Sequence, residues 1–140
     1  STRAGAIFDG FPRTVLQARA LDDMLGELGR RVRAAIMIDV SDDEVVRRNS
    51  GRRMCAQCQR TYHVEFSPPK QAGVCDSDGG LLQTRADDEP DKIRARLLAY
   101  HRDTAPVVGY YRDKGLLRQV DGARPQDDVY ARLVDVARRA

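Results

Sequence analysis

The sequence of 140 residues contains no tryptophan, and aromatic residues make up only 6% of it. So few aromatic rings offer little surface on which nucleic-acid bases could stack. Long apolar runs are also missing, because the longest, Ala34 to Ile38, is far shorter than the ~20 residues that cross a bilayer. We therefore expect neither a nucleic-acid partner nor a membrane partner.

Cysteine is scarce, and its three copies all fall between Cys55 and Cys75. An odd number of cysteines, in a sequence that does not open with a secretory signal, disfavours a disulfide framework. We expect reduced thiols and a cytoplasmic protein.

Lysine is the third scarce residue, with three copies among the 24 basic side chains. The excess of arginine favours a phosphorylated ligand, because a planar guanidinium matches phosphate oxygens. A genome that substitutes arginine for lysine on protein surfaces would give the same excess. The net charge of +3 is too small to indicate nucleic-acid binding by itself.

Short apolar runs alternate with helical patterns along most of the chain. Strands are predicted at residues 6–9, 34–40 and 117–121, and helices from Thr14, from Ser41, from Pro90 with an interruption near Pro106, and from Pro125. This alternation predicts an α/β fold with a parallel sheet, and three strands are few for so much apolar helix surface, so we expect the sheet to be incomplete. Ligands gather at the carboxyl ends of such strands, where Asp9 stands.

The pattern changes in residues 51–88, which are rich in Cys, Gly, Pro and Gln. We call these residues the inserted region and predict short strands in it at 61–66 and 81–84. The predicted domains are therefore a core segment at 1–50, the inserted region at 51–88 and a second core segment at 89–140.

Two matched pairs of metal-binding residue types lie inside the inserted region. Cys55 and Cys58 are separated by two residues, and so are Cys75 and Asp78. Two such pairs can close a tetrahedron around one zinc ion, and four protein ligands would make the metal structural. His63 and Asp76 compete with Asp78 for the fourth position; the equal spacing favours Asp78, and a site without metal is also open.

The segment Asp9-Gly10-Phe11-Pro12-Arg13-Thr14 joins the first predicted strand to a helix. The carboxylate can hold magnesium or its water, and Arg13 can reach an anion at the start of the helix. Gln17 lies one turn further and can hydrogen-bond a planar base. A capped surface helix without a ligand is the alternative.

Arginines stand at both ends of the inserted region: Arg48, Arg52 and Arg53 where the chain enters it, and Arg85, Arg94 and Arg96 where the chain leaves it. Such residues could close over a polyphosphate and stabilise charge that develops during transfer. The alternative for each is a solvated helix face with aspartate partners such as Asp87 and Asp88. A second class of function is a zinc-ribbon module that binds nucleic acid or protein.

Seven motifs in one order resemble the adenylate kinase family, in its bacterial form with a long, zinc-bearing lid. They are Asp9-Gly10-Phe11-Pro12-Arg13-Thr14, Gly51-Arg52-Arg53, Thr61-Tyr62-His63-Val64, Pro68-Pro69-Lys70, Thr84-Arg85-Ala86-Asp87-Asp88, Ile93-Arg94-Ala95-Arg96-Leu97 and Val120-Asp121-Gly122. The resemblance implies the core of a P-loop nucleoside monophosphate kinase, with a zinc-ribbon-like lid inserted in it. It also implies reversible phosphoryl transfer, ATP + AMP giving two ADP, with Mg²⁺ on the phosphates, in adenine nucleotide homeostasis.

The resemblance assigns roles to individual residues. It implies an AMP site at Gly10, Arg13 and Gln17, and an ATP site at Arg48, Arg52, Thr61, Tyr62 and Arg124. It implies that Arg85 and Arg96 clamp the phosphates between donor and acceptor, that Arg52 assists, and that Asp9 orients Mg²⁺ through water. It places the lid zinc on Cys55, Cys58, Cys75 and Asp78.

One family motif does not occur in these residues: the phosphate-binding pattern G-x-x-x-x-G-K. The chain therefore resembles the C-terminal two-thirds of an adenylate kinase, and we expect a fragment with little activity alone. The complete enzyme is expected to be a monomer, whereas the shorter chain could self-associate through exposed apolar edges.

Overall fold

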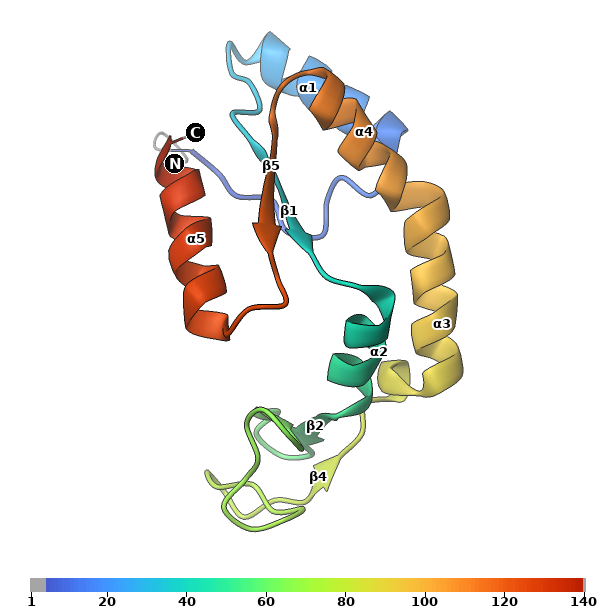
Figure 1. The fold of residues 1–140 in the computed structure, drawn as a ribbon, viewed down its shortest axis with the longest axis vertical. Helices are drawn as coiled ribbons and strands as arrows, with labels where there is room; N and C mark the ends of the chain where they lie inside the picture. The colour runs from blue at the N-terminus through green and yellow to red at the C-terminus, as the bar shows by residue number, and fades with distance from the viewer. Residues whose placement is uncertain (1–4, 140) are drawn as a thin grey trace. The chain divides into compact units, whose positions relative to one another are not determined.

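The computed structural model describes residues 5–139. The helices and strands follow one another as the ribbon shows (Figure 1). They are α1 (Val15–Glu27), β1 (Ala35–Asp39), α2 (Asp42–Ser50), β2 (Arg52–Cys55), β3 (Thr61–His63), β4 (Leu82–Gln83), the 3₁₀ helix η1 (Ala86–Asp88), α3 (Pro90–Ala99), the π-helix η2 (Tyr100–Thr104), α4 (Ala105–Asp113), β5 (Leu117–Asp121) and α5 (Gln126–Arg139).

The chain forms two compact units. The first contains the residues before position 40 together with those from Leu98 onward, and the second contains Val40–Leu97. Each unit is described by itself below.

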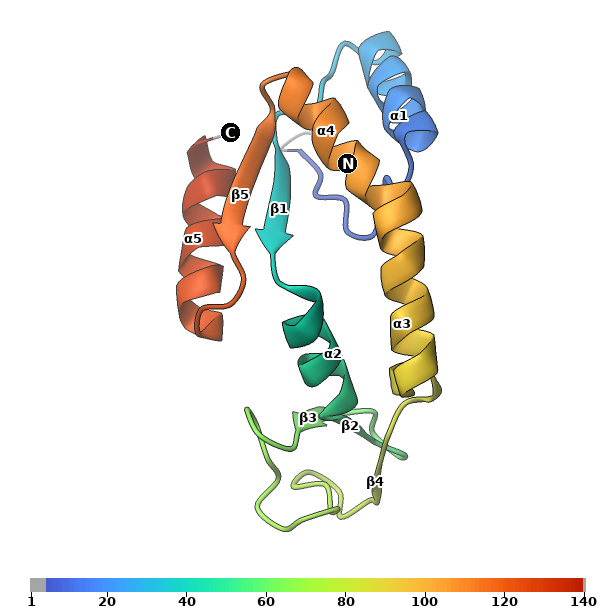
Figure 2. The ribbon, with the colours of Figure 1, turned by 45° about the vertical axis from the view of Figure 1, so that its right-hand side comes forward.

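The first unit is a parallel α/β layer, as the alternating pattern predicts. Strands β1 and β5 pair in parallel, from Ala35 opposite Leu117 to Asp39 opposite Asp121. Helices α4 and α5 flank the two strands from opposite sides (Figure 2), and α1 packs on α4. Two carboxylates, those of Asp39 and Asp121, therefore end neighbouring strands.

A small apolar core lies between α1 and α4. Ala18, Val107 and Tyr111 are buried there, and Val32 and Leu116 pack against them. An ion pair from Lys114 to Asp22, which also accepts a hydrogen bond from the Tyr110 hydroxyl at 2.8 Å, ties the same two helices together.

The strand predicted at residues 6–9 is not formed. Residues 5–8 have no regular secondary structure, and the Ile7 side chain is 92% exposed. A parallel strand needs a neighbour to complete its backbone hydrogen bonds, and among residues 5–139 β1 and β5 pair only with each other. The described parallel sheet thus has two strands where three are predicted.

Helix starts and the interruption near Pro106 follow local chemistry. The Thr14 and Ser41 hydroxyls accept hydrogen bonds from the N–H groups of Gln17 and Glu44, as N-cap residues do. The π-helix η2 comes just before Pro106, with the Ala105 N–H bonded to the Tyr100 carbonyl. A wider turn at this point accommodates a proline ring that would clash with the carbonyl four residues earlier.

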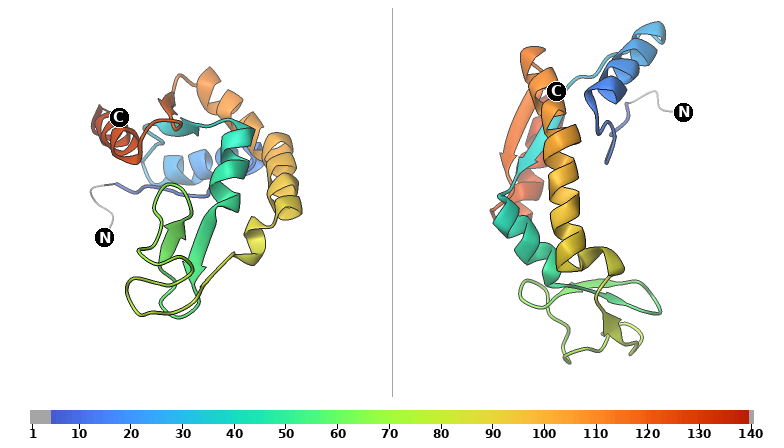
Figure 3. Two further views of the ribbon diagram at one scale, coloured as in Figure 1. Left: turned by 60° about the horizontal axis from the view of Figure 1, so that its bottom comes forward. Right: turned by 90° about the vertical axis from the view of Figure 1, so that its right-hand side faces the viewer.

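The second unit contains a three-stranded antiparallel sheet in the order β3-β2-β4; the green to yellow-green part of the ribbon in Figure 3 is the segment that forms it. Strands β3 and β4 lie within the predicted short strands. Strand β2 is not predicted, because Arg52 and Arg53 at its start do not fit the apolar pattern of a strand. Buried Cys55, Tyr62 and Cys75 form its small core. The domain limits at 51 and 88 stay predictions.

Candidate active site and metal centre

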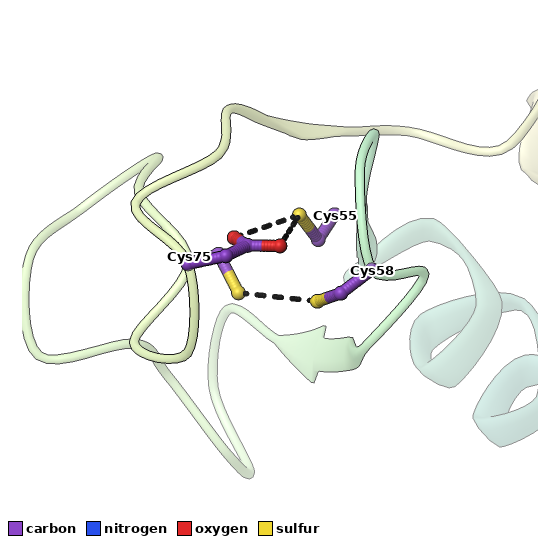
Figure 4. Close-up of side chains that lie close together, drawn as sticks. Cys55, Cys58 and Cys75 are labelled. Carbon is purple, nitrogen blue, oxygen red and sulfur yellow. Dashed lines mark hydrogen bonds between the residues drawn. The ribbon is translucent and has the colours of Figure 1, made fainter.

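Four side chains come together in the second unit, and we call them the Cys3Asp cluster: Cys55, Cys58, Cys75 and Asp78. Their ligand atoms all lie within 4.8 Å of one another. The Cys55 sulfur lies 3.3 Å from Asp78 Oδ1, and the Cys58 and Cys75 sulfurs face each other at 3.6 Å (Figure 4). Ligands at ~2.0–2.3 Å from a tetrahedral zinc ion are about 3.3–3.8 Å apart, so these separations suit one ion.

Backbone N–H groups hold the cluster in place. The Gln57 and Ser77 N–H groups donate to the Cys55 and Cys75 sulfurs, at 3.3 and 3.4 Å. The Gly80 N–H donates to Asp78 Oδ1 at 2.9 Å, and a Cβ at Gly80 would lie only 2.8 Å from the Cys55 sulfur. Glycine is therefore required where the chain passes the cluster.

The protonation of the metal-free cluster is uneven. The Gly80 N–H, followed by the thiols of Cys58 and Cys75, lowers the pKa of Asp78. At Cys58 the Arg60 backbone lowers the pKa, but Asp78, desolvation and the other two thiols outweigh it and raise the pKa to about 12. Zinc binds the thiolate, so a metal ion at this cluster would displace the Cys58 proton.

The two competing ligands lie outside the cluster. Nδ1 of His63 accepts hydrogen bonds from the Glu65 and Phe66 N–H groups, both at 3.1 Å, and its ring stacks on Phe66. The Asp76 carboxylate accepts from the Lys70 N–H at 2.9 Å. The arrangement in the structure therefore favours Asp78 as the fourth ligand.

Arg52 and Asp88 form a two-bond ion pair between β2 and η1. Arg52 donates from Nε to Asp88 Oδ2 at 2.8 Å and from its NH2 nitrogen to Oδ1 at 2.6 Å. Asp88 is 1% exposed, and the Arg52 guanidinium, aided by Arg85 and Arg96, holds the pKa of this carboxyl low. Three arginines assigned to phosphate binding thus act on one buried carboxylate.

The predicted AMP segment lies in the first unit, ahead of α1. Gly10 has φ +72°, and its carbonyl accepts a hydrogen bond from Arg13 Nε at 2.7 Å. The Arg13 N–H donates to Gln17 Oε1 at 2.7 Å, and the Thr104 hydroxyl donates to the Arg13 carbonyl at 3.0 Å. Glycine is favoured at position 10 because of its positive φ. Gly10, Arg13 and Gln17 are therefore brought together, and Asp9 is exposed beside them.

The other predicted residues lie apart from these contacts. Arg48 pairs with Glu44 on α2 at 2.7 Å, and Arg124 pairs with Asp121 at 3.1 Å after β5. Thr61 is exposed on β3, Arg85 is exposed before η1 and Arg96 is exposed on α3.

Sequence reasoning missed two roles. Asp88 was considered only as a surface partner for arginines, yet it is the buried partner of Arg52. Tyr62 was expected to line a nucleotide site, and its hydroxyl also contacts the Cys75 sulfur at 3.3 Å. The one signal for Asp88 in the sequence is that it follows another aspartate at the start of a helix. That signal does not distinguish an aspartate that caps a helix from one that forms a buried ion pair.

Comparison with known proteins decides the family. The family model "Adenylate kinase" matches residues 1–116. The chain belongs to the adenylate kinase family. The adenylate kinase of Symbiobacterium thermophilum is 48% identical over 136 residues, which are 97% of this chain and 63% of that protein. The adenylate kinase of Acidothermus cellulolyticus is 47% identical over 136 residues, which are 97% of this chain and 63% of that protein. The adenylate kinase of Lachnospira eligens is 46% identical over 132 residues, which are 94% of this chain and 62% of that protein.

Membership of the adenylate kinase family bears on the other predictions. An α/β layer with a parallel sheet fits the predicted kinase core, and the alternative of a zinc-ribbon binding module is not favoured. The chain spans a little over three-fifths of the length of the curated relatives it matches. Within residues 5–139, none of the helices combines the length and the apolar character that crossing a membrane needs.

Proposed function

We propose that this chain provides the lid and part of the AMP site of an adenylate kinase, which reversibly transfers a phosphate from ATP to AMP and gives two ADP. The observation that carries the proposal is the two-bond pair of Arg52 with buried Asp88, a carboxylate that also feels the charges of Arg85 and Arg96, in a chain of this family. Phosphoryl transfer depends on positioning and on neutralising phosphate charge, which is what guanidinium groups supply.

On the AMP side, the turn around Gly10 prepares Arg13 for a phosphate. Arg13 uses Nε for the Gly10 carbonyl, so its outer N–H groups can bind the AMP phosphate. Gln17 uses its oxygen for the Arg13 N–H, so its amide N–H₂ group can donate to the adenine.

On the ATP side, the proposed contacts come mostly from the second unit. Arg48 would pack against the adenosine, Arg52 would bind the phosphates, and Thr61 and Tyr62 would line the lid. Arg124, in the first unit, would lie beside the adenine. Arg48 would exchange its partly buried ion pair with Glu44, one turn away on α2, for contacts with the nucleotide.

For the transfer itself, Arg85 and Arg96 would clamp the phosphates between donor and acceptor. Their exposure leaves them able to reach a ligand, and closure of the lid would exclude water that otherwise hydrolyses ATP. Asp9 would hold the water shell of Mg²⁺, which supplies positive charge beside the phosphate oxygens when bound with ATP.

The Cys3Asp cluster would hold a structural Zn²⁺ in the lid. Its separations suit a tetrahedron, and all four ligands come from the protein, which leaves no open position for chemistry. The buried core beside it consists of Cys55, Tyr62 and Cys75, too few residues to stabilise the inserted region alone.

AMP binding to the zinc-loaded chain tests the first part of this proposal. Arg13→Ala should abolish AMP binding in a calorimetric titration, whereas Arg19→Ala, an exposed arginine on the same helix, should leave it unchanged. Equal AMP affinity in the two variants would contradict the assignment of the AMP site.

ADP formation from ATP, AMP and Mg²⁺ tests the second part. These residues lack the G-x-x-x-x-G-K pattern that cradles the donor phosphates, so we expect the chain alone to give little ADP. Rapid ADP formation by the pure chain would refute that expectation.

A further inference from the structure

The Arg52–Asp88 pair joins residues 36 positions apart, and its two members differ in burial. The Asp88 side chain is completely covered, whereas 28% of the Arg52 side chain is exposed. Asp88 is the only charged residue among 5–139 whose side chain is buried in this way. A buried carboxylate persists only with strong partners, so this pair is a fixed feature of the second unit.

The geometry of the pair determines which part of Arg52 is left for a ligand. Nε and the NH2 nitrogen both donate to Asp88, so one side of the planar guanidinium is used. The NH1 nitrogen lies on the opposite edge and carries two further N–H donors. The carboxylate therefore fixes the direction of the group without using all its donors.

Charge explains why a carboxylate is needed at this position. Arg52, Arg85 and Arg96 all act electrostatically on Asp88, and without it three positive groups would repel one another. The phosphates of a bound nucleotide would supply negative charge to these arginines, and Asp88 supplies it when no nucleotide is bound.

We propose that Asp88 is a positioning residue that aims Arg52 at the phosphates of ATP. This inference rests on the proposed function. Asp88 does not touch the nucleotide; it acts through Arg52, whose side chain it orders in advance and so spares the cost of ordering on binding. A carboxylate that merely competed with phosphate for Arg52 would have the opposite effect on affinity.

The test measures MgATP affinity by calorimetry in four forms of the zinc-loaded chain: wild type, Arg52→Ala, Asp88→Asn and the double variant. We expect Arg52→Ala and Asp88→Asn each to weaken binding about tenfold, and the double variant to be no weaker than Arg52→Ala. Asp91→Asn removes the same charge from an exposed carboxylate on α3 and should bind MgATP like wild type.

Nitrogen-15 NMR of the Arg52 Nε–H gives a readout that a purely structural role would not change in this way. In the wild type this N–H should exchange slowly with water, and in Asp88→Asn it should exchange rapidly while the backbone amides of β2 and β3 keep their positions. The double variant has neither the carboxylate nor the guanidinium, so it leaves no buried charge unpaired and gives the MgATP affinity of the chain without the pair.

Three results would overturn the inference. They are tighter MgATP binding by Asp88→Asn, unchanged binding by Asp88→Asn when Arg52→Ala weakens it, and additive losses in the double variant. A wild-type chain that binds no MgATP would instead contradict the proposed function itself, so the two failures are distinguishable.

Discussion

The Tyr62 hydroxyl lies 3.3 Å from the Cys75 sulfur and accepts a hydrogen bond from the Asp76 N–H at 2.8 Å. Tyr62 is on β3 and Cys75 precedes β4, so one side chain connects the sheet to the second pair of the Cys3Asp cluster. The residue expected to line the ATP site is thus also part of the framework that holds the Cys3Asp cluster.

Replacement of Tyr62 by phenylalanine should destabilise the second unit. The change keeps the ring but removes the hydroxyl that accepts a hydrogen bond from the Asp76 N–H and contacts the Cys75 sulfur. We expect the thermal midpoint of the zinc-loaded chain to fall by about 5 °C. Tyr130→Phe is the control, because Tyr130 is 68% exposed on α5; equal midpoints for the two variants would contradict the prediction.

The fourth metal ligand can be identified by comparing two neighbouring aspartates. Asp78→Ala should weaken zinc binding by more than about 100-fold, because it removes a ligand rather than an outer contact. Asp76→Ala should retain zinc, since the Asp76 carboxylate bonds to the Lys70 N–H. Zinc affinity measured by competition with a chelator decides between them. His63→Ala completes the series, and loss of zinc there but not in Asp78→Ala would assign the ligand to His63.

The sequence predicts those features that depend on local chemistry. Thr14 and Ser41 begin helices because their side chains cap them, and β5 occupies the predicted residues 117–121. Each half of the Cys3Asp cluster is equally local, because one short turn brings its two side chains together.

Features that depend on distant partners are not predictable in the same way. Residues 6–9 have the apolar composition of a strand but no strand partner among the described residues, and β2 forms although it begins with two arginines, because β3 and β4 pair with it. The pairing of Arg52 with Asp88, across 36 positions, has no periodicity that a sequence pattern could reveal.

Gly51 is a position where only glycine fits, and it provides a third prediction. A Cβ there would lie 2.3 Å from His63 Nε2, and the His63 ring is held by two backbone N–H groups and by stacking on Phe66. Gly51→Ala should therefore destabilise the second unit by about 1–3 kcal/mol. Gly109→Ala is the matched control, because a Cβ on that α4 glycine meets nothing within 4 Å and should stabilise the helix by up to ~1 kcal/mol. Urea unfolding of both variants measures the difference, and a stabilising Gly51→Ala would show that the ring can move.

Tyr111 provides the last prediction, which concerns pH. Its hydroxyl is buried in the first unit and has no hydrogen-bond partner among the residues of the structure, and burial raises its pKa to about 12. The ordinary pKa of tyrosine is about 10. Because the folded pKa is the higher one, the contribution of the neutral phenol to stability is complete below about pH 10 and is lost as the pH rises through 12.

Tyr111→Phe should therefore act in two ways. It removes a hydroxyl that is buried without a partner, so the free energy of unfolding of the first unit should rise by about 1 kcal/mol at pH 7. It should also abolish the part of the alkaline destabilisation that comes from this phenol, which urea unfolding between pH 8 and pH 11.5 would measure as a flatter profile. Tyr130→Phe, on the exposed face of α5, should change neither quantity. A Tyr111→Phe variant that is less stable than wild type at pH 7 would contradict this prediction, because the removal of a buried hydroxyl without a partner should not cost stability.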